Sequence, residues 1–276
     1  MTRTGCPDGV TPGGTSRPSL PPPELRAYLE ELVSRACAVC GDRLVSVLAV
    51  GSLALGDYRH GRSDVDVTVV VDHAPPRADL SGLAGTLAHP ALACPAAGLE
   101  LVVYATDFAA RPSGEAGYLL DLDTGPSLPE RASYDPAEAP AFWYVIDRSV
   151  AHQAGLPLYG APTRDVIAAP DRPTVLAALR ASVREHADGD GHLADNRVLN
   201  GCRAAVHCRT GHWFAKRGAG EIVAASEPAF EPLITEALRS FERPRARAAV
   251  LPAEDVRAFL AWVAARVEET AAAAGV

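Results

Sequence analysis

The stretches VGSLALG (residues 50–56) and SDVDV (residues 63–67) decide the fold of this chain. The first closes a short apolar run with a Gly-Ser pair, and the second places Asp64 and Asp66 two residues apart on a predicted strand. Side chains at positions i and i+2 of a strand share a face, so the two carboxylates lie side by side while the valines pack the other face. Carboxylates this close repel each other unless a cation shares the site.

Both stretches suit a nucleotide phosphate that is bound together with a metal ion. Oxygen ligands are the ones that Mg²⁺ prefers, and Mg²⁺ commonly also binds substrate phosphates. Gly51 and Ser52 at a strand end can offer backbone N–H groups and a hydroxyl to a triphosphate. A lone DxD pair on a strand is more often a solvated face. The full order of strand, Gly-Ser, turn, SDxD and strand is specific.

The apolar patterns around this motif predict an α+β fold. Strands are predicted over residues 44–50, 65–71 and 99–105, and a helix from Pro23 that stops at Gly41. The strand signal vanishes from about Thr174. Helices are predicted beyond it, over residues 174–186, 196–210, 228–241 and 253–273. We expect an N-terminal domain built on a mixed sheet, followed by an all-α helical-bundle domain.

The composition places the domain boundaries. Residues 1–23 are rich in Gly, Pro, Ser and Thr and predict a disordered tail. The first domain is assigned to residues 24–165 and the helical domain to residues 166–276, with the boundary near the Pro-rich stretch 157–173. A predicted helix over residues 141–153 fits either domain.

Charge and cysteine content limit the classes of partner. The net charge is −8 with no basic stripe, which argues against a role in binding a nucleic-acid backbone. An acidic balance suits a cationic small molecule, although it also serves solubility. The six cysteines lack a disulfide-framework spacing, and neither a signal pattern nor an apolar run of about 18 residues is present. We expect a cytoplasmic, monomeric protein without a membrane partner.

The motif resembles the signature of the polymerase-β-type nucleotidyltransferase superfamily. The resemblance rests on Gly51-Ser52 followed by Ser63-Asp64-Val65-Asp66. It implies two Mg²⁺ ions held by the pair Asp64 and Asp66 and by a third carboxylate from a neighbouring strand. Glu100, inside an apolar run, fits that third place as metal ligand and catalytic base, because a bare buried carboxylate is costly. The alternative is an edge-strand glutamate that faces water.

The C-terminal half resembles the helical domain of streptomycin/spectinomycin adenylyltransferases. The resemblance is carried by NRVLNGCR (residues 196–203), Thr210-Gly211 and KRGAGE (residues 216–221). It implies that Lys216 reaches the phosphates of ATP, and Lys216 is the sole lysine among 26 basic residues. It also implies that Asn196 and Arg203 line the nucleotide cleft.

Departures from that family concern the acceptor. The serine that precedes the lysine in the family is Ala215 here, and the loop before Asn196 keeps acids but has no tryptophan. We expect these acids to pair with ammonium groups of the substrate; they are Glu185, Asp188, Asp190 and Asp195. Without the aromatic platform, we expect spectinomycin-like aminocyclitols to be accepted better than streptomycin.

The expected activity is the Mg²⁺-dependent transfer of AMP from ATP to a hydroxyl of a small cationic acceptor. An aminoglycoside or aminocyclitol antibiotic is the leading acceptor, with resistance as the consequence. One alternative keeps the chemistry and changes the acceptor to a protein hydroxyl, a lincosamide or another metabolite. A second is a non-catalytic nucleotide-binding or antitoxin-like module, which predicts the loss of a metal ligand, whereas Asp64, Asp66 and Glu100 are all present.

Overall fold

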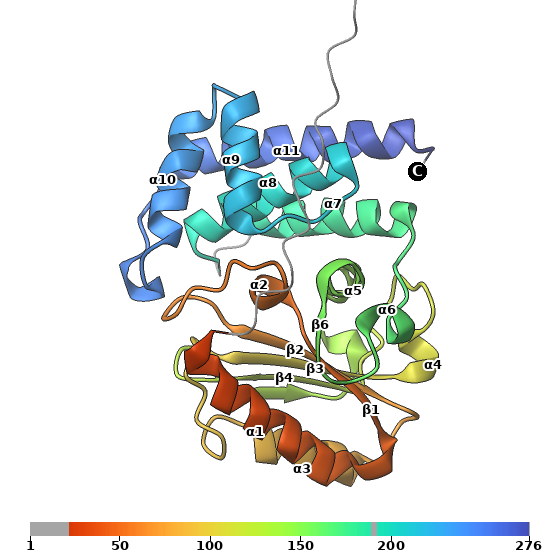
Figure 1. The fold of residues 1–276 in the computed structure, drawn as a ribbon. Helices are drawn as coiled ribbons and strands as arrows, with labels where there is room; N and C mark the ends of the chain where they lie inside the picture. Colours follow the sequence, from red (N-terminus) through yellow and green to blue (C-terminus); the bar gives the residue numbers. More distant parts are fainter. Residues whose placement is uncertain (1–21, 189–191, 276) are drawn as a thin grey trace, which may run out of the picture.

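The computed structural model describes residues 22–188 and 192–275. Most of the expected tail, residues 1–21, lies outside the described residues. Figure 1 shows two stacked parts, with a sheet and its covering helices below and a layer of helices above. In the described part of the chain, no helix combines the length and the apolar character that crossing a membrane requires.

The lower part is a six-stranded mixed sheet with the strand order β5-β4-β3-β2-β1-β6. Strands β2 and β3 run parallel, and the other neighbouring pairs run antiparallel. The bounds are β1 Leu44–Ala49, β2 Val65–Val71, β3 Leu99–Ala105, β4 Leu120–Thr124, β5 Arg131–Ser133 and β6 Leu156–Gly160. The prediction of β1, β2 and β3 is therefore confirmed, whereas β4, β5 and β6 were missed. These three are short, and strands of this length depend on their neighbours more than on their own pattern.

The two faces of the sheet have different roles. On one face, Val65, Val67 and Val69 pack in a core with helices α1 (Pro23–Cys40) and α3 (Arg77–Leu87). The opposite face carries Asp66, and the short helix α2 (Gly51–Ala54) and helix α5 (Ala141–Ala154) lie above it (Figure 1). The structure thus confirms the prediction that strand alternation puts the valines on one face and the aspartate on the other. Two further short helices are α4 (Thr106–Ala109) and α6 (Thr163–Val166).

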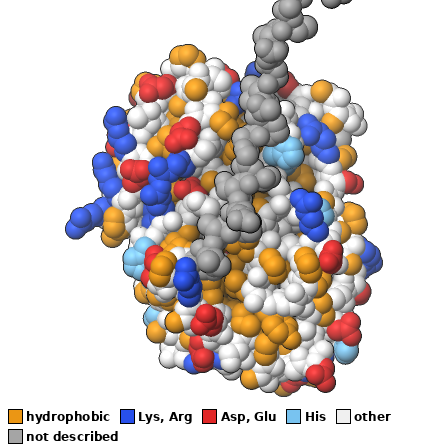
Figure 2. Space-filling view, in the orientation of Figure 1, with side chains coloured by type: hydrophobic (Ala, Val, Ile, Leu, Met, Phe, Trp, Pro, Cys, Tyr) orange, Lys and Arg blue, Asp and Glu red, His pale blue; other side chains and the backbone are white. Residues whose placement is uncertain are grey.

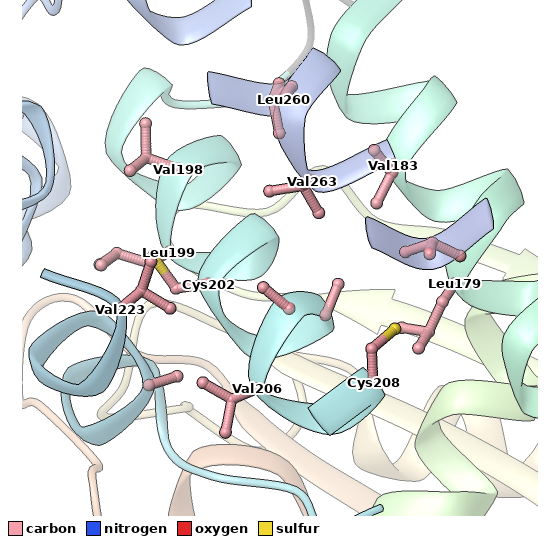
Figure 3. Packing of buried hydrophobic residues seen from close by; sticks show 14 of the residues in the cluster. Leu179, Val183, Val198, Leu199, Cys202, Val206, Cys208, Val223, Leu260 and Val263 are labelled. Atoms are coloured by element: carbon pink, nitrogen blue, oxygen red, sulfur yellow. The ribbon is translucent and has the colours of Figure 1, made fainter. Parts of the chain in front are cut away.

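The upper part is built around helix α8 (Ala194–Thr210). Figure 3 shows its side chains Leu199, Cys202 and Val206 among apolar side chains of the neighbouring helices. The other helices are α7 Arg172–Asp188, α9 Lys216–Ser226, α10 Glu231–Phe241 and α11 Ala253–Ala273. The predicted helices correspond to α7, α8, α10 and α11, but α9 was missed. Its two glycines weaken the helix signal, and Gly220 is there because a Cβ would lie 2.9 Å from Leu238.

Helix α5 joins the two parts. Its Val145 and Ile146 belong to the core of the upper part, while Tyr144 and Ala151 belong to a cluster over the sheet. The chain then returns to the sheet as β6, which pairs with β1. The open face of the sheet and the upper helices are therefore held facing each other, with α5 between them.

Candidate active site

A cavity of about 520 Å³ lies between the open face of the sheet and the upper helices. Its lining includes all eight residues that the sequence assigned to metal and nucleotide, namely Gly51, Ser52, Asp64, Asp66, Glu100, Asn196, Arg203 and Lys216. Five come from the sheet part and three from α8 and α9. The fold thus brings both halves of the motif to one place.

The carboxylates form a row across the sheet. Asp66 on β2 is in register with Glu100 on β3, which is in register with Asp123 on β4, and Asp123 in turn with Arg131 on β5. Neighbouring strands are about 4.8 Å apart, so adjacent side chains in the row interact. The carboxyl groups of Asp66 and Glu100 are within hydrogen-bonding reach of one another. The Glu100 side chain is open to the cavity, and desolvation by the surrounding protein, followed by repulsion from Asp66 and Asp64, raises its pKa well above the ordinary value.

Gly51 leaves the space that the Asp66 side chain occupies. Its φ angle is +56°, and a Cβ at this position would lie 1.9 Å from Asp66 Oδ2. Both the backbone conformation and the close approach therefore require glycine. The backbone N–H of Ser52 donates to the Asp66 carboxylate, while Ser52 Oγ is buried and makes no hydrogen bond. The Gly-Ser turn thus positions one carboxylate and leaves a hydroxyl available in the cavity.

Asp64 lies just before β2 and is only half satisfied. Its Oδ2 accepts a hydrogen bond from Arg245, whereas its Oδ1 is buried without a partner. Burial raises the pKa of Asp64 to about 6 even though Arg245 lowers it, and the neighbouring Asp66 raises it further. The side chain is thus under-compensated by the cations that the protein itself supplies.

The donor set fits a divalent cation. Among residues 22–188 and 192–275, no three His, Cys, Asp or Glu side chains converge as a preformed metal cluster. However, the buried Oδ1 of Asp64 lacks a partner, and desolvation by the surrounding protein is the main cause that raises the pKa of Asp66 and of Glu100. Carboxylate oxygens with uncompensated charge are what Mg²⁺ binds in proteins. Asp64, Asp66 and Glu100 are the residues that would hold it.

The upper helices contribute cations to the cavity. Lys216 is the first residue of α9, and its Nζ donates to Asn196 Oδ1 over 3.2 Å. Burial, assisted by the charge of Arg203, lowers the pKa of Lys216 to about 8. The start of α9 is fixed to the motif because Asp57 Oδ2 accepts the backbone N–H of Arg217 over 3.2 Å. Asp57 therefore links the turn after α2 directly to the helix that carries Lys216.

Of the four acids expected to bind substrate, the three that the structure describes do not reach the cavity. Glu185 and Asp188 are exposed and are absent from its lining, and Asp190 lies outside the described residues. Asp195 is fully buried, where it forms an ion pair with Arg62 over 2.8 Å. Ser240 near the end of α10 also donates to Asp195, so this carboxylate serves contacts between elements rather than the cavity.

Four other acids line the cavity, and none of them was assigned to the site from the sequence: Asp57, already described, and three more. The three are Asp121 and Asp123 on β4 and Asp147 on α5. Tyr144 and Arg131 both donate to Asp121, and Arg131 also donates to Asp123 over 2.8 Å. The alternation in LDLDT (residues 120–124) and the lone acid in the apolar helix 141–150 were the signals that could have identified them.

An aromatic group lines the cavity beside the upper helices. Trp143 makes edge contacts with His186 and His192 at centroid distances of 5.4 and 5.7 Å. The two histidine rings stack at 4.8 Å. By contrast, Trp213 is packed against His207 at 4.1 Å and is buried. Trp143 is therefore the tryptophan whose ring is better placed to meet a ligand.

The comparisons with known proteins agree with this geometry. Residues 28–108, which contain β1, β2, β3 and the motif, match the family model of a nucleotidyltransferase domain. No curated protein matches the sequence significantly. Among solved structures, the chain is similar to the crystal structure of spectinomycin adenyltransferase AAD(9) from Enterococcus faecialis with ATP and spectinomycin. The TM-score is 0.66 with 17% sequence identity, over 88% of this chain and 98% of that chain. This likeness confirms the expected fold, a mixed-sheet domain followed by a helical region.

Proposed function

We propose, from the premise that this chain carries a nucleotidyltransferase domain over residues 28–108, that the protein transfers AMP from ATP to a hydroxyl of a small cationic acceptor. An aminocyclitol or aminoglycoside antibiotic is the acceptor class that we favour. One observation carries the proposal. The carboxylates Asp64, Asp66 and Glu100 share a cavity of about 520 Å³ with Lys216 from the other half of the chain.

The nucleotide would bind at the end of the cavity that holds the cations. Ser52 Oγ and Lys216 Nζ are suited to the triphosphate, and Arg203 adds a second positive charge. Asp64, Asp66 and Glu100 would hold two Mg²⁺ ions, which when bound supply Lewis-acid stabilisation of the charge that develops on phosphate and acceptor oxygens. Glu100 lies beside Asp66, so a metal ion held by Asp66 would bring the α-phosphate close to Glu100. The acceptor hydroxyl would then approach the α-phosphate next to Glu100.

The chemical step is an in-line displacement at the α-phosphorus. The acceptor oxygen forms the new bond to phosphorus, and the bond between the α-phosphorus and the α,β-bridging oxygen breaks, so that pyrophosphate leaves. Glu100 accepts the proton of the hydroxyl. Lys216 stabilises the negative charge that develops on the transferred and leaving phosphates.

Acidic side chains in the cavity are suited to bind the cationic groups of an acceptor. Asp123 follows Glu100 in the carboxylate row, and Asp147 lines the same cavity from α5. Asp147 is exposed to the cavity, and desolvation by the surrounding protein, together with repulsion from Asp66, raises its pKa to about 7, so a bound ammonium group would stabilise its ionised form. Such pairs contribute specificity more than raw affinity.

Incubation with ATP, Mg²⁺ and a panel of aminocyclitols, aminoglycosides, lincosamides and protein extract tests the proposal. Mass spectrometry should find an added AMP on an aminocyclitol or aminoglycoside, with stoichiometric pyrophosphate release. The matched control is Asp66→Asn, which should give neither product. An AMP adduct confined to a lincosamide or a protein would retain the chemistry and reject the acceptor class. Nucleotide binding with no transfer to any acceptor would favour the non-catalytic module.

A comparison of two drugs as acceptors narrows the acceptor class further. We propose that spectinomycin is used more efficiently than streptomycin, because residues 185–195 contain no tryptophan on which a large guanidinylated sugar could stack. The comparison is kcat/KM for both drugs at one Mg²⁺ and salt concentration. Equal or higher efficiency with streptomycin, together with its selective loss in Trp143→Leu, would instead identify Trp143 as a stacking platform.

A further inference from the structure

Two arginines attach the segment after α10 to the turn before β2. Arg62 Nη1 donates to the carbonyl oxygens of Ser240 and Arg243 over 3.1 and 3.2 Å. In return, Arg245 Nε donates to the carbonyl oxygen of Arg62 over 3.0 Å. Each guanidinium therefore binds the main chain of the other segment. This reciprocal contact holds the two segments together, and the terminal nitrogens of Arg245 take no part in it.

The terminal nitrogens of Arg245 serve a different contact. Nη2 donates to Asp64 Oδ2 over 2.5 Å, and the Arg245 side chain is 30% exposed, compared with 3% for Arg62. The second carboxylate oxygen of Asp64 is buried without a partner. Arg245 thus covers half of a carboxylate that the metal would bind, and it does so from a position that solvent reaches.

Arg245 also lines the cavity with Ser52 and Lys216. A planar guanidinium binds carboxylate and phosphate oxygens with the same fork of donors. Figure 2 shows basic side chains on the α10 side of the face in view, with acidic side chains among them. The contact of Nε with the carbonyl of Arg62 would keep the guanidinium beside the cavity after Asp64 is taken by another cation.

We propose that Arg245 is a ligand of the nucleotide triphosphate that the nucleotide-free protein holds on Asp64. This inference rests on the proposed function. Binding of a divalent cation at Asp64 displaces the guanidinium, which then pairs with phosphate oxygens of the incoming nucleotide. Arg245 therefore competes with the metal ion in the absence of nucleotide and assists binding when the nucleotide is present.

The variant Arg245→Gln separates this role from that of a structural clamp. Mn²⁺ binding without nucleotide is measured by electron paramagnetic resonance, and MgATP binding without acceptor by titration calorimetry. We expect Mn²⁺ to bind several-fold more tightly and MgATP about tenfold more weakly, as the loss of one charge-assisted hydrogen bond predicts. A structural clamp predicts that both affinities weaken together. Unchanged or weaker Mn²⁺ binding, or unchanged MgATP binding, overturns the proposal.

Two further variants complete the test. Arg247→Gln removes an exposed arginine of the same turn that does not line the cavity, and both affinities should stay at the wild-type values. Arg245→Lys keeps the charge but loses the forked donors, so it should bind MgATP more weakly than wild type and more tightly than Arg245→Gln. If Arg245→Gln does not fold, the comparison of Arg245→Lys with wild type is the test. MgATP affinity at the wild-type value or below that of Arg245→Gln contradicts the phosphate contact. Wild-type protein that binds neither Mn²⁺ nor MgATP contradicts the proposed function itself.

Discussion

Arg62 and Asp195 form an ion pair over 2.8 Å in which the two side chains are 3% and 0% exposed. Arg62 lies in the turn before β2 and Asp195 in the first turn of α8, so the pair joins the sheet part to the helical part. Ser240 Oγ also donates to Asp195 Oδ2, which connects the end of α10 to the same point. This contact helps to fix the helices above the carboxylate row.

We predict that Asp195→Ala strongly destabilises the protein. Removal of one partner of a buried ion pair leaves an uncompensated charge, here that of Arg62, at a cost of roughly 3–5 kcal/mol. Urea denaturation measures the change in the free energy of unfolding. The matched control is Glu269→Ala, which removes an exposed partner of Arg266 and should change stability little. A loss for Asp195→Ala no larger than that of the control would show that the buried pair does not hold the two parts together.

Asp66→Asn should abolish AMP transfer and leave the fold intact. Burial raises the pKa of Asp66 and thus disfavours its charged form, so a neutral amide relieves that cost in metal-free buffer. The thermal midpoint without metal should stay the same or rise, while pyrophosphate release disappears. Asp107→Asn, an exposed position on α4, is the control and should change neither quantity. Activity within about tenfold of wild type would reject Asp66 as a metal ligand.

Lys216→Arg should slow the chemical step although it conserves the charge. The Lys216 ammonium is a compact group that donates to Asn196, and a forked guanidinium in its place would shift the triphosphate. A displacement of about 1 Å can cost on the order of a hundredfold in rate. Single-turnover kinetics with saturating ATP measures the effect, with Arg239→Lys on the exposed side of α10 as control. A silent Lys216→Arg would mean that Lys216 does not contact the phosphates.

Asp147→Asn should weaken acceptor binding selectively. The KM for a cationic acceptor should rise about tenfold, as expected for one lost charge-assisted contact, while the KM for ATP stays constant. Because the pKa of Asp147 is about 7, the carboxyl group ionises as the pH rises through this value, and the difference between variant and wild type should grow with it. A tenfold change in the KM for ATP instead would show that Asp147 lies beside the nucleotide in the cavity and not beside the acceptor.

His186 should make the protein less stable in acid. Its Nδ1 donates to the carbonyl oxygen of Ser182 over 2.7 Å, and its Nε2 accepts from the Asn200 amide over 3.0 Å. The contact with Asn200 requires a neutral ring, because a protonated Nε2 cannot accept. Burial lowers the pKa of His186 from 6.5 to about 4. The unfolded chain therefore binds the proton first, and stability is lost as the pH falls from 6.5 to about 4, by on the order of 3 kcal/mol.

The matched variants His186→Gln and His73→Gln measure this contribution, His73 being exposed. The free energy of unfolding is determined between pH 4 and pH 7 for both and for wild type. Glu100 and Asp147 have raised pKa values and act in the opposite direction, so only the difference between variants is informative. His186→Gln should lose less stability in acid than the other two proteins; an identical slope would contradict the neutral ring.

The sequence by itself determined the motif and the elements with a clear period. Strands β1, β2 and β3, with Gly51, Asp66 and Glu100 on them or at their ends, follow from local apolar runs and from alternation. The register of three neighbouring strands then forces Asp66, Glu100 and Asp123 into one row, which a sequence pattern does not contain. Lys216 was assigned to the phosphates through family resemblance, since no local pattern places it beside the motif.

Only the tertiary structure decided what the remaining charges do. Asp195 has the sequence context of a substrate ligand, yet the packing of α8 against α10 buries it beside Arg62. Asp147 has the context of an ordinary helix residue, yet α5 lies between the two parts and turns it into the cavity. A charge acquires its role from the partner and the solvent that it meets, and both are set by contacts between segments far apart in the chain. Local propensity carries no information about such contacts.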